Sequence, residues 1–184
     1  MISWGILCKK MIYIHLAEGF EEIEALTAVD VLRRADIDVQ TVSITGNKMV
    51  KGTHGISVEA DILYEEADYP SCEMIVLPGG LPGADYLEEH EGLAKHIVCF
   101  AKDESKKLAA ICAAPQVFGT CGILEGKNAT IYPGMESHLK EGKATGENVT
   151  VDGNVTVSGN ARIILCDGKT LTIVKTLLTD TEKN

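Results

Sequence analysis

Apolar residues follow two different periods along the chain. Short apolar or alternating runs typical of strands lie at 11–16, 38–44 and 73–77, and another run leads into Cys112. Between the first two runs, Ile23, Leu26, Ala28 or Val29, and Leu32 recur at helical spacing and predict a helix over 21–35. A second helical stretch covers 87–102. This alternation of strands and helices predicts a parallel sheet covered by helices on both faces, which is an α/β fold.

Two further segments are predicted to form hairpins. In residues 48–59, Gly52 and Gly55 interrupt short β-prone runs and favour a hairpin or an edge excursion. Strands at 149–151 and 154–158 flank Asp152-Gly153, a pair that favours a tight hairpin turn.

The remaining elements are short. After Cys112 we expect a helix that continues over 117–121 and ends at Gly122, then a strand over 128–132 and a short amphipathic helix over 169–178. Residues 1–10 are interpreted as an irregular N-terminal extension. Residues 11–184 are then a single domain, because a chain of this length can bury one adequate core.

The amino-acid composition argues against one class of binding partner. Hydrophobic residues make up 45% of the chain and aromatic residues only 5%, as suits close helix–sheet packing. The formal net charge is −10 and the mean hydropathy is +0.07. An acidic surface without a basic cluster repels phosphate backbones, so we expect no nucleic-acid partner.

The N-terminal segment is the one stretch that resembles a targeting sequence. It lacks a positive region before the apolar run, and Lys9-Lys10 interrupt that run. No run approaches the roughly 18 apolar residues of a membrane span. We therefore expect a cytoplasmic protein with reduced cysteines and no membrane contact. With no C-x-x-C pair and the histidines apart from the cysteines, we expect no metal and no cofactor.

The strongest candidate for chemistry is Cys112, in the stretch Lys107 to Gln116. An apolar run, a cysteine, two small residues and a proline predict a strand that turns sharply into a helix. A thiol at that turn would face the free N–H groups of the helix, which favour the thiolate, the nucleophilic form. The other cysteines have no such context and are interpreted as packing residues. They are Cys8, Cys72, Cys99, Cys121 and Cys166.

Three blocks resemble the ThiJ/PfpI superfamily, also called the DJ-one family. They are LAEGFEEIEALTAVDVLRRA from Leu16, VLPGGLPGADYL from Val76 and AAICAAP from Ala109. The chain is more similar to the DJ-one/ThiJ branch than to the PfpI proteases. The resemblance implies a flavodoxin-like, three-layer α/β/α sandwich with a mostly parallel sheet, like class I glutamine amidotransferases, and usually a homodimer.

The resemblance also implies a set of site residues. Cys112 matches the reactive cysteine, and Glu24 matches a glutamate whose carboxyl group lies close to the thiol. An ionised carboxylate would raise the cysteine pKa, so Glu24 assists only if it keeps its proton and donates to the thiolate. The alternative for Glu24 is a solvated acid in the first turn of a helix.

Backbone N–H groups complete the implied site. Those of Gly80 and Ala113 match an oxyanion-type site, and Gly79 is a candidate for the pocket lining. The alternative for the glycines is a tight turn that merely requires them, and both roles can hold together.

The chain departs from the family pattern at the histidine positions. PfpI-type proteases place a histidine directly after the cysteine, where this chain has Ala113. Relatives on the other branch carry a histidine near the thiol, where this chain has Tyr132, a poor general base at neutral pH. His15 is a further pocket candidate, and like His54 and His138 it has a packing or surface role as its alternative. The segment 157–168 also replaces the usual Ser-x-Gly-Pro-type turn.

Two functions of different classes follow. The first is a cysteine-dependent enzyme of the glyoxalase or deglycase kind, acting on a small carbonyl substrate or a glycated side chain through Cys112. The second is a redox-responsive protein in which Cys112 is oxidised to a sulfinate held by the same donors. A cysteine peptidase is disfavoured because Ala113 follows the thiol.

Overall fold

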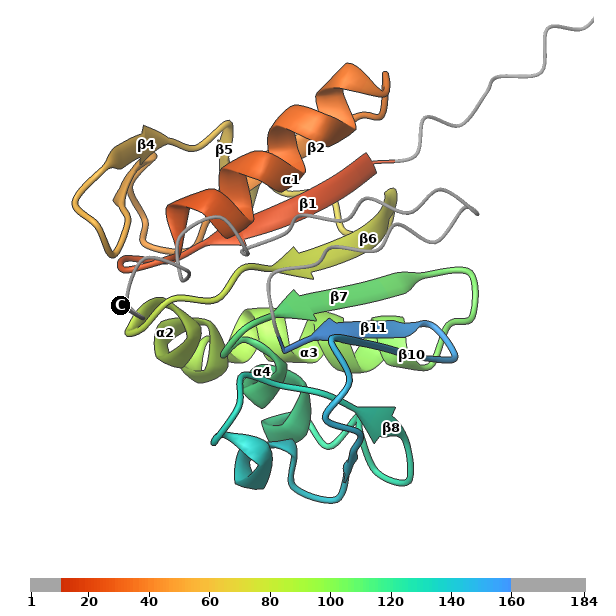
Figure 1. Ribbon diagram of the computed structural model, residues 1–184. Helices are drawn as coiled ribbons and strands as arrows, with labels where there is room; N and C mark the ends of the chain where they lie inside the picture. Colours follow the sequence, from red (N-terminus) through yellow and green to blue (C-terminus); the bar gives the residue numbers. More distant parts are fainter. Residues whose placement is uncertain (1–10, 160–184) are drawn as a thin grey trace, which may run out of the picture.

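The computed structural model describes residues 11–159, and within them a central sheet of seven strands organises the chain (Figure 1). Every pair of neighbours in this sheet is parallel except the hairpin at one edge, so the predicted mostly parallel sheet is confirmed. In spatial order the strands are β10 (Val149–Asp152), β11 (Val155–Ser158), β7 (Lys107–Ile111), β6 (Cys72–Leu77), β1 (Met11–Leu16), β2 (Val39–Ser43) and β5 (Ile62–Leu63).

Helix α1 (Glu22–Arg34) covers one face of the sheet. Its buried stripe comprises Ala25, Ala28, Val29 and Leu32, which pack on the Ile14 side of β1. The sequence pattern included Ile23 in this stripe, and that assignment is wrong, because Ile23 is 58% exposed. The first turn of α1 instead buries acidic residues that have polar partners in neighbouring loops.

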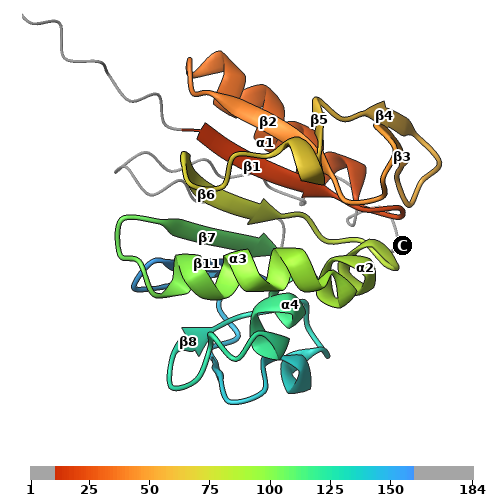
Figure 2. The same ribbon diagram turned by 180° about the vertical axis from the view of Figure 1, so that it is seen from behind.

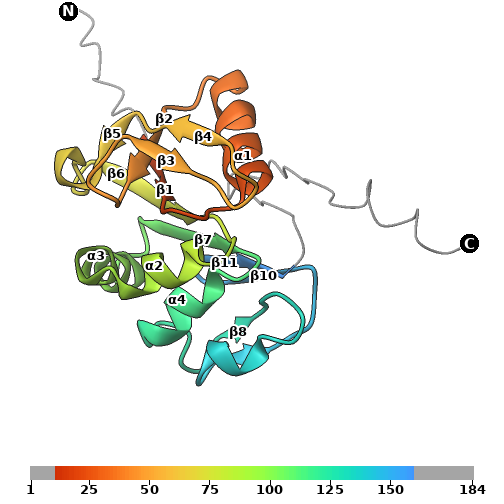
Figure 3. The ribbon, with the colours of Figure 1, turned by 90° about the vertical axis from the view of Figure 1, so that its left-hand side faces the viewer.

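Three helices cover the opposite face, so the fold is the expected three-layer sandwich (Figures 2 and 3). They are α2 (Gly83–Glu89), α3 (Glu91–Ala101) and α4 (Pro115–Thr120). The single helix predicted over 87–102 is therefore two helices that meet at His90. The backbone of His90 is extended, and its Nδ1 accepts a hydrogen bond from the Leu93 N–H, so this residue ends α2 and caps α3.

The smaller elements lie beside this sandwich. The predicted hairpin over 48–59 is present as β3 (Met49–Lys51) and β4 (Ser57–Glu59). The strand predicted over 128–132 is present only as β8 (Asn128–Ala129), which pairs with β9 (Lys143–Ala144) in a separate sheet. The 3-10 turns are η1 (Tyr64–Glu66) and η2 (Glu136–Leu139).

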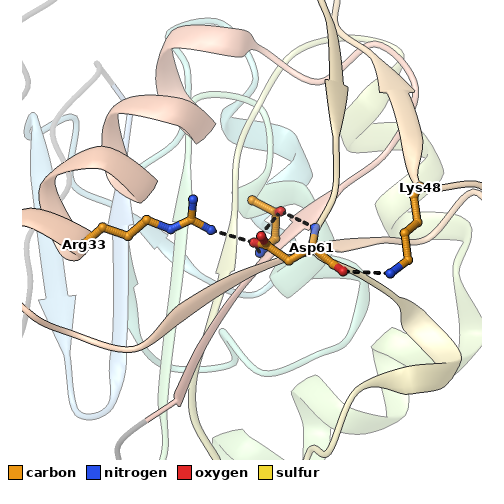
Figure 4. A network of polar contacts seen from close by, with 4 residues as sticks. Arg33, Lys48 and Asp61 are labelled. Atoms are coloured by element: carbon orange, nitrogen blue, oxygen red, sulfur yellow. Dashed lines mark hydrogen bonds and ion pairs between the residues drawn. The ribbon is translucent and has the colours of Figure 1, made fainter.

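Asp61 ties the edge strand to the end of α1 (Figure 4). Its Oδ2 accepts hydrogen bonds from Arg33 Nη2 at 2.7 Å and from the backbone and hydroxyl of Thr41. Its carbonyl oxygen accepts from Lys48 Nζ at 2.9 Å. The network fixes β5 against β2 on the side of the sheet away from Cys112.

No helix within residues 11–159 is long and apolar enough to cross a membrane. The extension predicted at 1–10, the helix predicted at 169–178 and most of the divergent segment 157–168 lie outside the described residues. Cys8 and Cys166 lie there as well. The single-domain assignment of 11–184 therefore stays a prediction.

Candidate active site

Cys112 occupies a strained turn between β7 and α4. Its φ is +61°, in the left-handed region of backbone conformation that residues other than glycine rarely adopt. The Cys112 N–H donates to the Ser158 carbonyl at 2.8 Å, and the Cys112 carbonyl accepts from the Tyr132 N–H at 2.8 Å. Hydrogen bonds to two neighbouring segments thus hold the turn. A strained strand-to-helix turn of this kind presents the side chain of its central residue at the carboxyl edge of the sheet.

The helix after Cys112 offers fewer N–H donors than the sequence suggested. Helix α4 has only six residues, and Pro115 at its start has no N–H. The Gln116 and Val117 N–H groups donate to the carbonyls of Ala113 and Ala114. The Ala113 N–H has no acceptor among residues 11–159. The expected set of free helix donors is therefore reduced to this backbone group, because the turn satisfies the others itself.

Glu24 is buried, with 4% of its surface exposed, so the alternative of a solvated helix acid is wrong. Its Oε2 accepts a hydrogen bond from the Gly79 N–H at 2.8 Å. The turn of α1 that carries it is capped by Glu21, whose Oε2 accepts from the Glu24 N–H at 2.9 Å. The cap and the strand end together fix the position of the Glu24 carboxyl group.

Gly79 lies between this carboxyl group and the cysteine. A Cβ atom added to Gly79 would lie 2.6 Å from the Cys112 Cβ and 2.7 Å from Glu24 Oε2. Those two atoms can therefore be no farther apart than the sum of these distances. The structure brings Cys112, Glu24 and Gly79 together, and the missing side chain of Gly79 provides the space for their approach.

Gly80 packs tightly on the turn between β1 and α1. Its φ is +91°, and an added Cβ would lie 2.5 Å from the Glu21 nitrogen and 2.7 Å from the Phe20 carbonyl carbon. Within residues 11–159 its N–H, like that of Ala113, has no hydrogen-bond acceptor. Gly80 and Ala113 follow the adjacent strands β6 and β7, so both donors lie at the same edge of the sheet.

Tyr132 meets the elbow through its backbone. Its N–H donates to the Cys112 carbonyl, while 44% of its surface is exposed. The strand predicted to reach Tyr132 stops at Ala129, and Tyr132 bonds to the elbow instead.

The structure does not bring His15 together with Cys112. His15 is completely buried, and its Nε2 lies 2.8 Å from the Tyr69 hydroxyl. Its ring stacks on Tyr69 on the face of the sheet that packs against α3, whereas Cys112 packs against the cluster under α1. Burial lowers the pKa of His15 to about 3, so its ring is neutral at pH 7.

The other histidines have different neighbours. His54 Nδ1 lies 2.8 Å from Glu22 Oε2, and Glu22 Oε1 accepts from the backbone N–H groups of His54 and Ile56. Glu21, Glu22 and His54 form the one group in the described chain whose spacing could hold a metal ion. Both oxygens of Glu22 already accept hydrogen bonds, so an ion would have to displace these partners. The expectation of no metal therefore stays a prediction.

Burial also affects the thiols of two other cysteines. It raises the pKa of Cys72 to about 12 and that of Cys121 to about 11, so both thiols stay protonated at neutral pH. Such thiols are poor nucleophiles and pack as small apolar residues.

Sequence reasoning missed two buried polar residues near this site. Glu22 anchors the β3–β4 hairpin, and Gln116 joins α4 to α2 through a hydrogen bond to Asp85. The sequence showed Glu22 as one acid among several, but a polar residue directly after Pro115 in an otherwise apolar elbow could have indicated Gln116.

A strained cysteine that follows a parallel strand, beside a buried carboxyl group, defines an α/β protein of the nucleophile-elbow class. The comparisons with known proteins are consistent with this class. The model of the DJ-1/PfpI family matches residues 10–171, and the chain belongs to this family.

The relatives place the chain on the DJ-1/ThiJ branch of the family. The chain is 37% identical over 158 residues to protein DJ-1 homolog B and 36% identical over 157 residues to DJ-1 homolog A, both of Arabidopsis thaliana. These alignments cover 85% of the chain but only 36% and 40% of the plant proteins, so the chain spans less than half of their length.

Two further relatives match over most of their own length. A protein of Pyrococcus abyssi named as a deglycase is 30% identical over 147 residues, which are 78% of this chain and 82% of that protein. The crystal structure of Drosophila melanogaster DJ-1beta superimposes with a TM-score of 0.77 at 32% identity, covering 82% of this chain and 81% of that one. The fold expected from the resemblance is therefore confirmed.

Proposed function

We propose that the chain is a cysteine-dependent enzyme of the glyoxalase or deglycase kind, acting on small reactive carbonyls or on glycated side chains. The observation that carries the proposal is the convergence of Cys112 and Glu24 on Gly79, at the sheet edge where the Gly80 and Ala113 N–H groups also lie. The deglycase name of the Pyrococcus relative supports the substrate class.

The first chemical step would be addition of the Cys112 thiolate to the carbonyl carbon. A carbon–sulfur bond forms, and the carbonyl electron pair moves onto oxygen. The N–H groups of Gly80 and Ala113 would stabilise this oxyanion. Glu24 would then transfer its proton to the oxygen and leave a neutral hemithioacetal and a Glu24 carboxylate. Oε2 of Glu24 accepts from Gly79, so Oε1 would carry the proton.

Turnover of methylglyoxal tests this proposal. Wild type should consume it, Cys112→Ser should lose nearly all activity, and Cys99→Ser should retain it, because Cys99 is exposed on α3 and provides a matched thiol control. Equal rates for wild type and Cys112→Ser, or no turnover in either, would overturn the proposal.

Glu24→Gln tests the proton donor separately. The amide oxygen still accepts from the Gly79 N–H, so the fold is retained, but the side chain has no acidic proton. We expect the rate of turnover to fall about 10²- to 10⁴-fold, which is the usual contribution of a general acid. Unchanged turnover would remove Glu24 from the mechanism.

A redox-responsive protein is the second candidate. The same two donors would hold a sulfinate formed on Cys112, and one similar structure, Toxoplasma gondii DJ-1, is described as oxidized, at 30% identity and a TM-score of 0.76. Mass spectrometry after mild peroxide treatment tests this function. Preferential oxidation of exposed Cys99 over Cys112 would count against it.

We also propose that the chain forms a homodimer in the cytoplasm. Ile23, Ile56 and Leu81 are large exposed apolar residues near the site. Ile56 and Leu81 are connected to each other through the β3–β4 loop, whose Thr53 hydroxyl donates to the Leu81 carbonyl. Sedimentation should give a dimer for wild type and a monomer for Ile23→Asp, and cell fractionation tests the compartment. A monomeric wild type would refute the assembly.

A further inference from the structure

Helices α2 and α4 lie side by side, and each begins just after one of the two proposed oxyanion donors. Gly80 is three positions before the start of α2, and Ala113 is two positions before the start of α4. Ala84, in the first turn of α2, donates its N–H to the Gly80 carbonyl, and Gln116 of α4 donates its N–H to the Ala113 carbonyl. The position of each donor is thus tied directly to the helix that follows it.

Two side-chain hydrogen bonds join these helices. Gln116 Nε2 donates to Asp85 Oδ1 at 2.8 Å, and the Thr120 hydroxyl donates to the Glu88 carboxylate. The partners are three positions apart on α2 and four apart on α4, so each pair of positions lies on one helix face. Gln116 forms the link nearest to the donors and is 1% exposed, whereas Thr120 forms the link one turn farther away.

The strands themselves do not extend to the donors. The register between β6 and β7 ends at Leu77 and Ala110. Beyond this point the Gly79 carbonyl accepts from the Glu21 N–H, and the Cys112 N–H turns to Ser158 in β11. The α2–α4 links thus join the two segments by hydrogen bonds beyond the end of the strand pairing.

We infer that Gln116 is a positioning residue that sets the separation of the Gly80 and Ala113 N–H groups. This inference rests on the proposed function of those two donors. Donors for an oxyanion act only when held within about 0.5 Å of the productive geometry. Loss of the buried amide link would allow α2 and α4 to shift relative to each other and move one donor away from the other. The Cys112 turn is held instead by Ser158 and Tyr132, and Glu24 by Gly79, so the thiol and the carboxyl group should keep their positions.

Gln116→Met and Thr120→Val form a matched pair for testing this role. Each removes one link between the same helices with a side chain of similar size. We expect Gln116→Met to lower kcat for methylglyoxal about tenfold, less than the ~10²–10³ loss of a whole oxyanion donor, with KM changed less than twofold. Thr120→Val should keep the wild-type kcat. Equal kcat values for wild type and Gln116→Met, or equal losses in both variants, would overturn the inference.

Exchanging the amide and the carboxylate between positions 116 and 85 tests whether the hydrogen bond can be restored. Gln116→Glu alone places a carboxylate against Asp85 and should lower kcat at least as much as Gln116→Met. Combined with Asp85→Asn, the new amide can donate to the new carboxylate, so the double variant should recover most of the lost kcat. Failure of the double variant to exceed Gln116→Glu would contradict a role for this hydrogen bond.

A readout without turnover separates this inference from the proposed enzyme activity. The amides of residues 84 and 116 donate to the Gly80 and Ala113 carbonyls, and their hydrogen exchange should accelerate in Gln116→Met but not in Thr120→Val, while the pH profile of Cys112 alkylation stays unchanged. If wild type turns over no methylglyoxal, the enzyme proposal fails, and this exchange pattern still decides the positioning role. If the two amides exchange at the wild-type rate in Gln116→Met, the positioning role of Gln116 is refuted.

Discussion

The Gly79 N–H donates a hydrogen bond to Glu24 Oε2 across 2.8 Å, and this bond joins the end of β6 to the first turn of α1. These two segments are 55 positions apart in the sequence. The bond gives a buried carboxyl group a backbone partner, which offsets part of the cost of removing it from water. Gly79 thereby has two roles, because its N–H holds Glu24 and its missing side chain admits the Cys112 turn.

Gly79→Ala should disturb both partners at once. The added methyl group would lie 2.6 Å from the Cys112 Cβ and 2.7 Å from Glu24 Oε2, closer than atoms of this kind approach in folded proteins. We expect a loss of about 1–3 kcal/mol in the free energy of unfolding, the usual cost of overpacking. Urea denaturation measures this loss of stability. The rate of Cys112 alkylation should also change, because the added methyl group lies against the Cys112 turn.

Gly146→Ala is the control for this substitution. Nothing lies within 4 Å of a Cβ added there, although its φ of +68° imposes the ordinary strain of a left-handed residue. It should therefore destabilise the protein without altering Cys112 alkylation. A wild-type rate of Cys112 alkylation in Gly79→Ala would show that the approach of the two groups does not depend on the space at Gly79.

Glu22→Gln should release the β3–β4 hairpin from α1. Burial acts to raise the pKa of Glu22, but hydrogen bonds from the His54 ring and from the backbone of His54 and Ile56 outweigh it and lower the pKa. The ionised form is thus the one that holds the loop. At pH 7 the variant should be about 1–2 kcal/mol less stable, and amide exchange over 52–56 should accelerate.

The pH dependence of the Glu22 contribution follows from the direction of the shift. A lowered folded-state pKa means that the stabilisation is present above the unfolded-state pKa and is lost as the pH falls through the folded-state value. The stability difference between wild type and Glu22→Gln should therefore shrink below about pH 4. A difference that stays constant down to pH 3 would mean that the carboxylate charge does not anchor the loop.

His15→Gln should make the protein less sensitive to acid. His15 has a folded-state pKa of about 3 because of burial, against 6.5 for the exposed side chain. Between these values the unfolded chain binds one more proton at this position, so wild type loses up to about 1.4 kcal/mol per pH unit as the pH falls below 6.5. Urea denaturation from pH 7 to pH 5 should show a shallower slope for the variant. Parallel slopes would refute the assignment of a neutral, buried His15.

The fold was predictable because its elements are strongly patterned, and the site was predictable only in part. The run into Cys112 and the two predicted hairpins are local features, so the sequence places them correctly. The family resemblance indicated Glu24 as a site residue. It did not indicate that Gly79 is the hydrogen-bond partner of Glu24, because this contact joins segments that are distant in the sequence. The inward position of Glu22 was missed because the sequence pattern placed Ile23 in the buried stripe, whereas Ile23 is exposed and Glu22 is buried. His15 was retained as a pocket candidate because alternation along β1 does not tell which face of the sheet holds the site.

Cys112→Gly should be more stable than Cys112→Ala, because the strain at this position belongs to the backbone. A residue with a Cβ at φ +61° costs about 1–2 kcal/mol relative to glycine. Glycine loses about 0.5–1 kcal/mol more conformational entropy on folding, so a net gain centred on about 0.75 kcal/mol remains. Ala113→Gly is the matched control, since Ala113 is not among the residues with positive φ and should show only the entropic loss. Urea denaturation of the three variants measures both differences. If Cys112→Gly proves no more stable than Cys112→Ala, the elbow is relaxed, and its left-handed turn cannot be explained as a conformational cost retained for the sake of the thiol.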